Sequence, residues 1–308
     1  MSRTVSHRPL EIDSPIKSHI NKKTLGLGIL SFTIVLLFMP LGHTLMILNE
    51  ELLPAHRVKL IGAIVIGAIG LALLIMAIKA NYNNTVKTLL GLIAGILVWT
   101  GWIEFSFVWI ANRLQVMPYM ENGEVATKPE YLIMPSSIGI LGAMLLIFLF
   151  SDTKCQLFVW FQKLFGLRKT ITTTTKQKKP LALTTFIETI MIIWTFYIVL
   201  LLAYDANIAG DRHILTYIVA FGSLAWSGYL IINLLKISRF DYSVRYAIPT
   251  VIIFWNFIEV LGRWNLFKEI WIHPFEYIVE LSIITIILVA LITFMIVQTL
   301  KGRLKVTA

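Results

Sequence analysis

The strongest constraint in this sequence is a set of eight apolar runs, each long enough to cross a bilayer as a helix. A membrane-spanning helix needs about 20 predominantly apolar residues, because the hydrocarbon core is about 30 Å thick. Such runs lie near 25–48, 58–78, 88–112, 131–150, 183–204, 213–235, 246–262 and 275–300. Only 14% of the 308 residues are charged and the mean hydropathy is +0.78, which excludes a soluble globular domain. We predict an all-α polytopic membrane protein whose surroundings are the lipid bilayer.

Basic residues predict how this chain is oriented in the membrane. If the N-terminus is inside, the inner segments hold all the Lys and Arg residues except Arg57, Lys59, Arg113, Lys128, Arg212, Arg263 and Lys268. Basic residues resist translocation, so this asymmetry predicts that both termini are cytoplasmic, as in a protein of the bacterial inner (plasma) membrane. It also accounts for the net charge of +10, which therefore gives no reason to expect a nucleic-acid partner. The acidic residues gather on the outer side and favour a cationic or proton-linked site there.

The two halves of the chain resemble each other at a constant offset. The matched pairs are Glu50 with Asp205, Glu104 with Glu259, Arg57 with Arg212, Gly67 with Gly222, Ile103 with Ile258, Trp109 with Trp264 and Arg113 with Lys268. Because each half has four spans, both halves enter the membrane in the same orientation, as two parallel four-helix repeats (4+4). The predicted divisions are a basic tail at 1–24, repeats at 25–150 and 183–300, an amphipathic and basic cytoplasmic linker at 151–182, and a tail at 301–308. Residues 157–165 of the linker are predicted to form an interfacial amphipathic helix.

Four carboxylates belong to the repeated pattern. Glu104 and Glu259 lie inside spans three and seven at matching depths, whereas Glu50 and Asp205 lie near outer loops. An ionised carboxylate at such a depth costs several kcal/mol unless it is paired, hydrated or protonated. The spacing predicts an ion pair between Glu259 and Arg263 one turn later, and a partner for Glu104 on another helix. These acids would either pin the repeats together or bind a cation, metal, proton or substrate.

The histidines indicate a second kind of site. His43, His56, His213 and His273 all fall near the outer interface. A haem needs two imidazoles at one depth, which His213 on span six and His273 on span eight would supply. This layout resembles haem A synthase, which also has eight spans in two parallel four-helix halves with outer-side histidines. The resemblance implies a haem-handling membrane protein, but the first half of this chain has His56 and no histidine opening span four.

A transition metal is the other cofactor that these groups would suit. Glu269, His273, Glu276 and Glu280 recur at helical spacings of three and four, which places an imidazole and several carboxylates on one face. His43 is a further candidate ligand. Acidic residues at such positions are also typical of an ordinary helix N-terminus, where the dipole favours them.

Aromatic residues and loops on the outer side complete the set of candidates. Trp102, Trp109 and Trp264 are typical of an interfacial aromatic belt, or would form walls of a substrate pocket. The outer loops 114–130 and 263–274 are candidate docking surfaces for a partner in a membrane complex.

Three hypotheses about function follow. The first is a membrane protein that binds a metal or haem, acting in redox chemistry, in cofactor maturation or as a subunit of an oxidoreductase complex. The second is a proton- or cation-coupled secondary transporter that uses Glu104 and Glu259. The third is a non-catalytic assembly or scaffold subunit. The single cysteine, Cys155, excludes an intrachain disulfide, and the sequence contains no P-loop, GxSxG or HExxH motif.

Overall fold

The computed structural model is predominantly helical and describes residues 19–53, 55–121, 124–151, 156–167 and 180–301. Its elements are α1 (Lys22–Glu51), α2 (His56–Lys79), α3 (Asn84–Val98), η1 (Trp99–Glu104), α4 (Phe105–Leu114), β1 (Tyr119–Glu121), β2 (Glu124–Thr127), α5 (Pro129–Ile133), η2 (Met134–Ser137), α6 (Ile138–Phe150), α7 (Gln156–Leu164), α9 (Leu181–Tyr204), α10 (Ile214–Leu234), α11 (Phe240–Arg263) and α12 (Ile278–Leu300).

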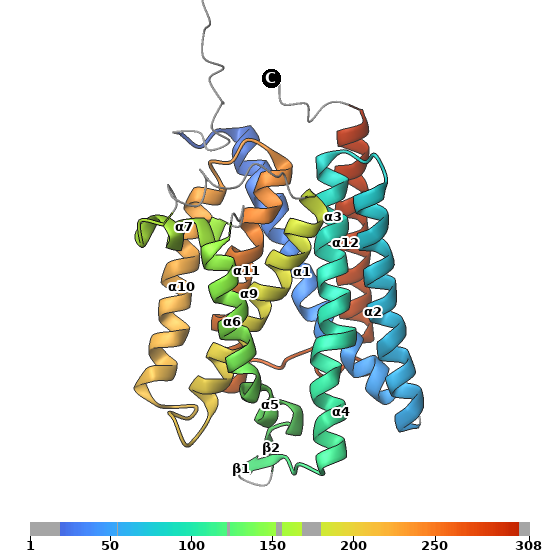
Figure 1. The fold of residues 1–308 in the computed structure, drawn as a ribbon, viewed down its shortest axis with the longest axis vertical. Coiled ribbons are helices and arrows are strands. Elements are labelled where there is room, and N and C mark those ends of the chain that lie inside the picture. Colours follow the sequence, from blue (N-terminus) through green and yellow to red (C-terminus); the bar gives the residue numbers. More distant parts are fainter. Residues whose placement is uncertain (1–18, 54, 122–123, 152–155, 168–179, 302–308) are drawn as a thin grey trace, which may run out of the picture.

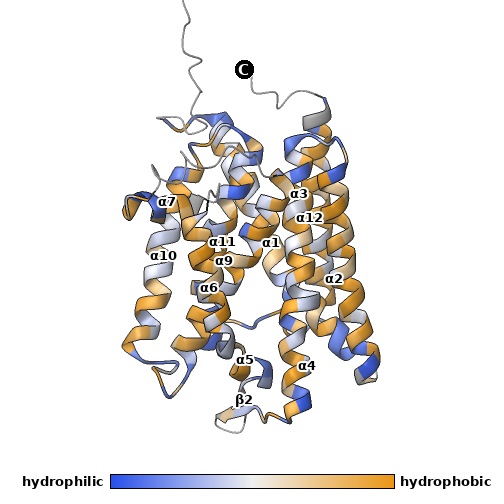
Figure 2. Ribbon diagram, viewed as in Figure 1, coloured by the Kyte–Doolittle hydropathy of each residue, from blue (hydrophilic) through white to orange (hydrophobic). Residues whose placement is uncertain are grey.

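Within the described residues, eight helices are long and apolar enough to cross a membrane, which confirms the number of predicted spans. They are formed by α1, by α2, by α3 with η1 and α4, by α5 with η2 and α6, and by α9, α10, α11 and α12. In Figure 2 hydrophobic residues cover most of the length of these helices, and hydrophilic residues gather toward their ends. The protein is an integral membrane protein.

Local sequence signals explain where several of these helices begin. The side chain of Asn21 accepts a hydrogen bond from the backbone N–H of Thr24 at 2.9 Å, and the hydroxyl oxygen of Thr24 accepts one from the backbone N–H of Asn21 at 3.0 Å, which forms a capping box before α1. Asn83 caps α3 by accepting from the N–H of Val86 at 2.9 Å. Such caps satisfy backbone donors that the first helical turn leaves unpaired.

Four helices form the centre of the bundle. α1 packs against α11, and α3 packs against α9, so both contacts join helices from different halves of the chain. α2 covers α3, α10 covers α11, α6 packs on α9, and α12 packs on α1 (Figure 1). Close approach at the α3–α9 contact depends on Gly91, because a Cβ atom there would lie 2.5 Å from the carbonyl oxygen of Ala182. The halves are therefore interleaved in the centre of the bundle.

The two ends of the bundle differ. α1, α4, α9 and α11 all end at the lower end in Figure 1, where β1 and β2 form a small antiparallel hairpin. We call this the hairpin end. α1 begins and α12 ends at the opposite end. The connection from α11 to α12 runs across the molecule from the α11 side to the α12 side (Figure 1).

The third span contains an irregularity next to Glu104. Residues Trp99–Glu104 form a π-helix, η1, between the regular helices α3 and α4. A π-helical segment inserts an extra residue into the helical turn and is frequently found at functional sites. Glu104 is its last residue and is only 2% exposed.

The amphipathic helix predicted in the linker is present as α7. Gln162 of α7 is fully buried, and its side-chain amide donates to the carbonyl oxygens of Leu149 and Ser151, each at 2.9 Å. This amide therefore satisfies carbonyl groups that the end of α6 leaves unpaired. Residues 152–155 and 168–179 of the predicted linker, most of the predicted tails (1–18 and 302–308), and Cys155 lie outside the described residues.

Candidate functional site

Glu104 is one centre of a buried polar cluster near the hairpin end. The hydroxyl group of Tyr197 on α9 lies 3.3 Å from Oε1 of Glu104 and 3.1 Å from the hydroxyl oxygen of Tyr131 on α5. A phenol carries one proton, so when Tyr131 donates to Tyr197, Tyr197 can donate to Glu104. Glu104 thus has its predicted partner on another helix, as the first member of a hydrogen-bonded chain.

Glu259 is the second centre of the same cluster. Its Oε1 atom accepts a hydrogen bond from Nε1 of Trp255 at 2.6 Å and lies 3.5 Å from Nε2 of His43. The imidazole ring of His43 stacks on the ring of Tyr197 with centroids 6.2 Å apart, and it interacts electrostatically with Glu104. Five side chains from α1, η1, α9 and α11 are therefore joined through His43. We call Glu104, Tyr197, His43, Glu259 and Trp255 the central cluster.

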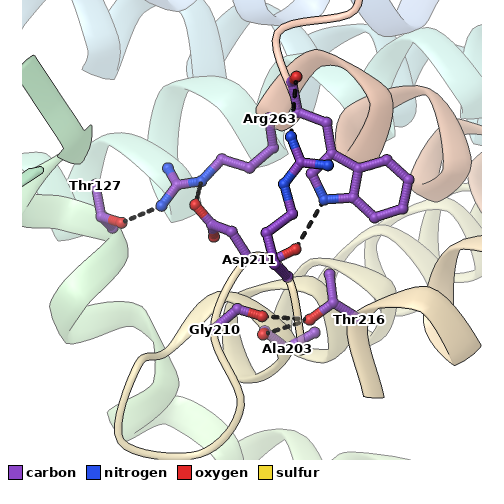
Figure 3. Close-up of polar contacts among 8 residues, drawn as sticks. Thr127, Ala203, Gly210, Asp211, Thr216 and Arg263 are labelled. Carbon is purple, nitrogen blue, oxygen red and sulfur yellow. Dashed lines mark hydrogen bonds and ion pairs between the residues drawn. The ribbon is translucent and has the colours of Figure 1, made fainter. Parts of the chain in front are cut away.

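The predicted ion pair between Glu259 and Arg263 is not formed among the described residues. Nε of Arg263 instead donates to Oδ2 of Asp211 at 2.9 Å, and its Nη2 donates to the hydroxyl of Thr127 at 3.2 Å (Figure 3). The guanidinium also lies over the ring of Tyr204, 5.2 Å from its centroid. Arg263 is the last residue of α11, so its side chain reaches the loop that carries Asp211, whereas Glu259 contacts His43 inside the bundle.

The loop between α9 and α10 is fastened to the end of α11. Nε1 of Trp264 donates to the carbonyl oxygen of Asp211 at 2.7 Å, and the guanidinium of Arg212 lies 5.3 Å from the centroid of the Trp264 ring. On the α10 side, the hydroxyl of Thr216 lies within hydrogen-bonding distance of the carbonyl oxygens of Ala203 and Gly210, at 3.0 and 2.6 Å (Figure 3). Trp264 thus has a structural role in holding this loop.

The remaining predicted acids lie outside the central cluster. Glu50 near the end of α1 interacts electrostatically with Lys128 and Glu130. Oδ1 of Asp205 accepts a hydrogen bond from the backbone N–H of Asn207 at 2.8 Å, which stabilises the turn after α9. The matched residues Glu50 and Asp205 therefore have different surroundings.

The histidine and metal candidates are dispersed. His213 caps α10, where its Nδ1 atom accepts from the N–H of Leu215 at 3.2 Å, and it is exposed, as are His273, Glu276 and Glu280. α10 packs on α11 and α9, whereas α12, which follows His273, packs on α1 and α3. The side chain of His56 lies outside the described residues.

No group of three or more His, Cys, Asp or Glu side chains within the described part of the chain is arranged around one metal position. The hypotheses of a metal or haem cofactor stay predictions.

Two of the predicted tryptophans make local contacts. Nε1 of Trp102 donates to the carbonyl oxygen of Ile64 on α2 at 3.1 Å. The ring of Trp109 lies under the guanidinium of Arg113, 5.6 Å from its centroid. Both side chains stabilise the third span or its contact with α2.

A buried ion pair lies nearer the opposite end of the bundle. Nε of Arg245 on α11 donates to Oε2 of Glu188 on α9 at 2.9 Å, and Nη2 donates to the other carboxylate oxygen, so the pair is bidentate. The exposed fractions are 8% for Arg245 and 1% for Glu188. The predicted seventh span starts at residue 246, so that Arg245 would lie in a cytoplasmic segment. The helix begins at Phe240, and the signal for this start is Asp241 in its first turn, where the dipole favours an acid.

Tyr197 carries no signal in the sequence that marks it as a site residue. It lies in the middle of an apolar run, with no spacing motif that would connect it to Glu104. Its role depends on which face of α9 packs against η1 and α1, and that face is set by the tertiary structure.

No known protein family, curated protein or solved structure matches this chain.

Proposed function

We propose that this protein is a proton-coupled secondary transporter in which Glu104 and Glu259 are the proton-exchanging groups. The observation that carries the proposal is the central cluster, in which His43 lies between both carboxylates. Ionisable residues inside membrane proteins usually face the bundle interior and mark ion pathways or proton relays. Histidine and tyrosine side chains can donate and accept protons in hydrogen-bonded chains with carboxylates.

Unpaired polar groups beside the cluster support a binding space for the coupled species. The side-chain amide nitrogen of Asn256 and the hydroxyl of Thr44 are buried and have no hydrogen-bond partner among the described residues. Asn256 lies one turn before Glu259 on α11, and Thr44 follows His43 on α1. Buried polar groups without partners are rare, and a bound polar ligand or water satisfies them.

The ion pair of Glu188 and Arg245 supports a route toward the opposite end of the bundle. A transporter needs polar groups at more than one depth, because the coupled species has to be accepted from both sides of the membrane. α9 carries both Tyr197 and Glu188, and α11 carries both Glu259 and Arg245. We infer that the surface between α9 and α11 forms the route.

The helix contacts support the repeat on which this proposal depends. If α1, α2, α3 and α6 correspond to α9, α10, α11 and α12, the contact of α1 with α11 corresponds to that of α9 with α3. Likewise the contact between α2 and α3 corresponds to the contact between α10 and α11. The contact between α1 and α12 corresponds to the contact between α9 and α6. We propose two parallel repeats, with both termini cytoplasmic and the hairpin end facing outward.

The test measures proton flux in proteoliposomes that contain a pH-sensitive dye, with a valinomycin-mediated potassium gradient as the driving force. Glu104→Gln and Glu259→Gln are each expected to reduce the flux by roughly 100-fold, because each replaces a proton-exchanging group with an amide. Glu276→Gln and Glu280→Gln are matched controls, since both side chains are exposed. Unchanged flux in both Glu104→Gln and Glu259→Gln would contradict the proposal.

A further inference from the structure

One carboxylate outside the spans lies next to the central cluster. Glu269 belongs to the connection between α11 and α12, and its side chain rests directly on Gly262 of α11. A Cβ atom at Gly262 would overlap the Cγ, Cδ and Oε1 atoms of Glu269. Gly262 follows Glu259 by three residues, so the two positions are neighbours on one face of the helix. The absence of a side chain at Gly262 therefore lets the carboxyl group of Glu269 lie beside Glu259.

The connection is held in this position by aromatic contacts. The ring of Trp271 packs on the ring of Trp255 with centroids 4.8 Å apart. Trp255 is also the residue whose indole N–H donates to Glu259. Because Trp271 follows Glu269 by two residues, this contact fixes the segment that carries Glu269 against the part of α11 that carries Glu259.

The charged and titratable groups around Glu269 come from three elements. Glu259 and Arg263 of α11 interact with it electrostatically, and Tyr204 of α9 lies in the field of Glu269, Glu259 and Asp211. Burial and the neighbouring Glu259 raise the pKa of Glu269 to about 8, against the opposing effect of Arg263. Arg263 is already paired with Asp211. These surroundings therefore favour the protonated form of Glu269.

We propose that Glu269 is the entry carboxyl through which protons pass between the aqueous phase at the hairpin end and Glu259. The proton of the Glu269 carboxylic acid moves to the Glu259 carboxylate, which leaves Glu269 ionised. Water at the hairpin end then returns a proton to Glu269, so the two steps together transfer one proton inward. Glu269 is half-buried, so part of it lies at the surface of the protein. This inference rests on the proposed proton exchange at Glu259.

The test follows the carboxyl C=O infrared band of Glu259 in the purified protein after a rapid pH jump. The band is identified as the one that Glu259→Gln removes. In Glu269→Gln the rate of protonation of Glu259 is expected to fall by roughly 100-fold, because the proton donor is lost. Gly262→Ala is expected to slow the rate as well. This variant keeps Glu269, but the new methyl group displaces its carboxyl group from Glu259. Glu276→Gln changes an exposed acid of the same segment. In this variant Glu259 should be protonated at the wild-type rate.

A rescue experiment separates proton delivery from a structural role. Formate, a small carboxylic acid, should restore the rate in Glu269→Gln, and Glu269→Asp should retain part of it, because both supply a carboxyl group near Glu259. A wild-type protonation rate in Glu269→Gln, or no rescue by formate, would overturn the inference. The infrared rate does not depend on transport, so loss of flux in Glu259→Gln combined with a normal rate in Glu269→Gln would reject only this inference. A slowed rate in Glu269→Gln with unchanged flux in both Glu104→Gln and Glu259→Gln would reject only the proposed function.

Discussion

Replacing Arg245 with methionine should destabilise the protein by an amount that depends on pH. In the folded protein the guanidinium of Arg245 donates two hydrogen bonds to the buried carboxylate of Glu188. A carboxylate that loses its charged partner in a low-dielectric interior is strongly disfavoured, and it avoids the full penalty by taking up a proton. The expected destabilisation is therefore the cost of keeping that proton on Glu188.

The magnitude follows from the ordinary pKa of a glutamate side chain, about 4.3 in an unfolded chain. Holding the carboxyl group protonated costs about 3.7 kcal/mol at pH 7 and about 1 kcal/mol at pH 5. The unfolded chain releases this proton above pH 4.3 while the folded Arg245→Met variant keeps it, so the variant loses stability as the pH rises. The value at pH 7 lies within the roughly 3–5 kcal/mol range for breaking a buried ion pair.

The assay is denaturant-induced unfolding in detergent, followed by tryptophan fluorescence and referred to the wild-type protein at each pH. Glu188→Gln is the matched control, because the arginine that it leaves cannot lose its charge, so its destabilisation should be the same at pH 5 and pH 7. The double variant Glu188→Leu with Arg245→Met should recover most of the wild-type stability, since an apolar pair of similar volume replaces the ion pair. Equal destabilisation of Arg245→Met at both pH values would refute this reasoning.

Two further predictions concern helix packing and the cofactor hypotheses. Gly101→Ala should destabilise the protein by about 1–3 kcal/mol, because its methyl group would lie 2.5 Å from the backbone nitrogen of Gly67. Gly139→Ala, which meets no atom within 4 Å, should instead stabilise α6 by up to about 1 kcal/mol, as measured by the same unfolding assay. His213→Ala and His273→Ala should leave proton flux unchanged, since both side chains are exposed. A Soret band of the purified wild-type protein that these two variants lose would favour the haem hypothesis over proton transport.

Burial of a carboxyl group could be inferred from the sequence, but its partner could not. The positions of Glu104 and Glu259 inside long apolar runs are enough to predict that both groups are shielded from water. The i to i+4 spacing then suggested Arg263 as the partner of Glu259, because local spacing is the only geometry available along one helix. In the structure Glu259 contacts His43 of α1 instead, and Arg263 forms an ion pair with Asp211 of a neighbouring loop.

The eight spans and the amphipathic helix α7 follow from the amino-acid sequence alone. These features depend on the local pattern of apolar residues and on the thickness of the bilayer. Which side chains contact each other is visible only in the folded protein, because pairing across helices depends on their rotation and on how closely they approach. Gly91 lets α3 approach α9, Tyr197 of α9 contacts Glu104, and the missing side chain at Gly262 admits Glu269. Each of these contacts joins residues that are far apart in the sequence or lie in separate elements, so no local sequence pattern predicts it.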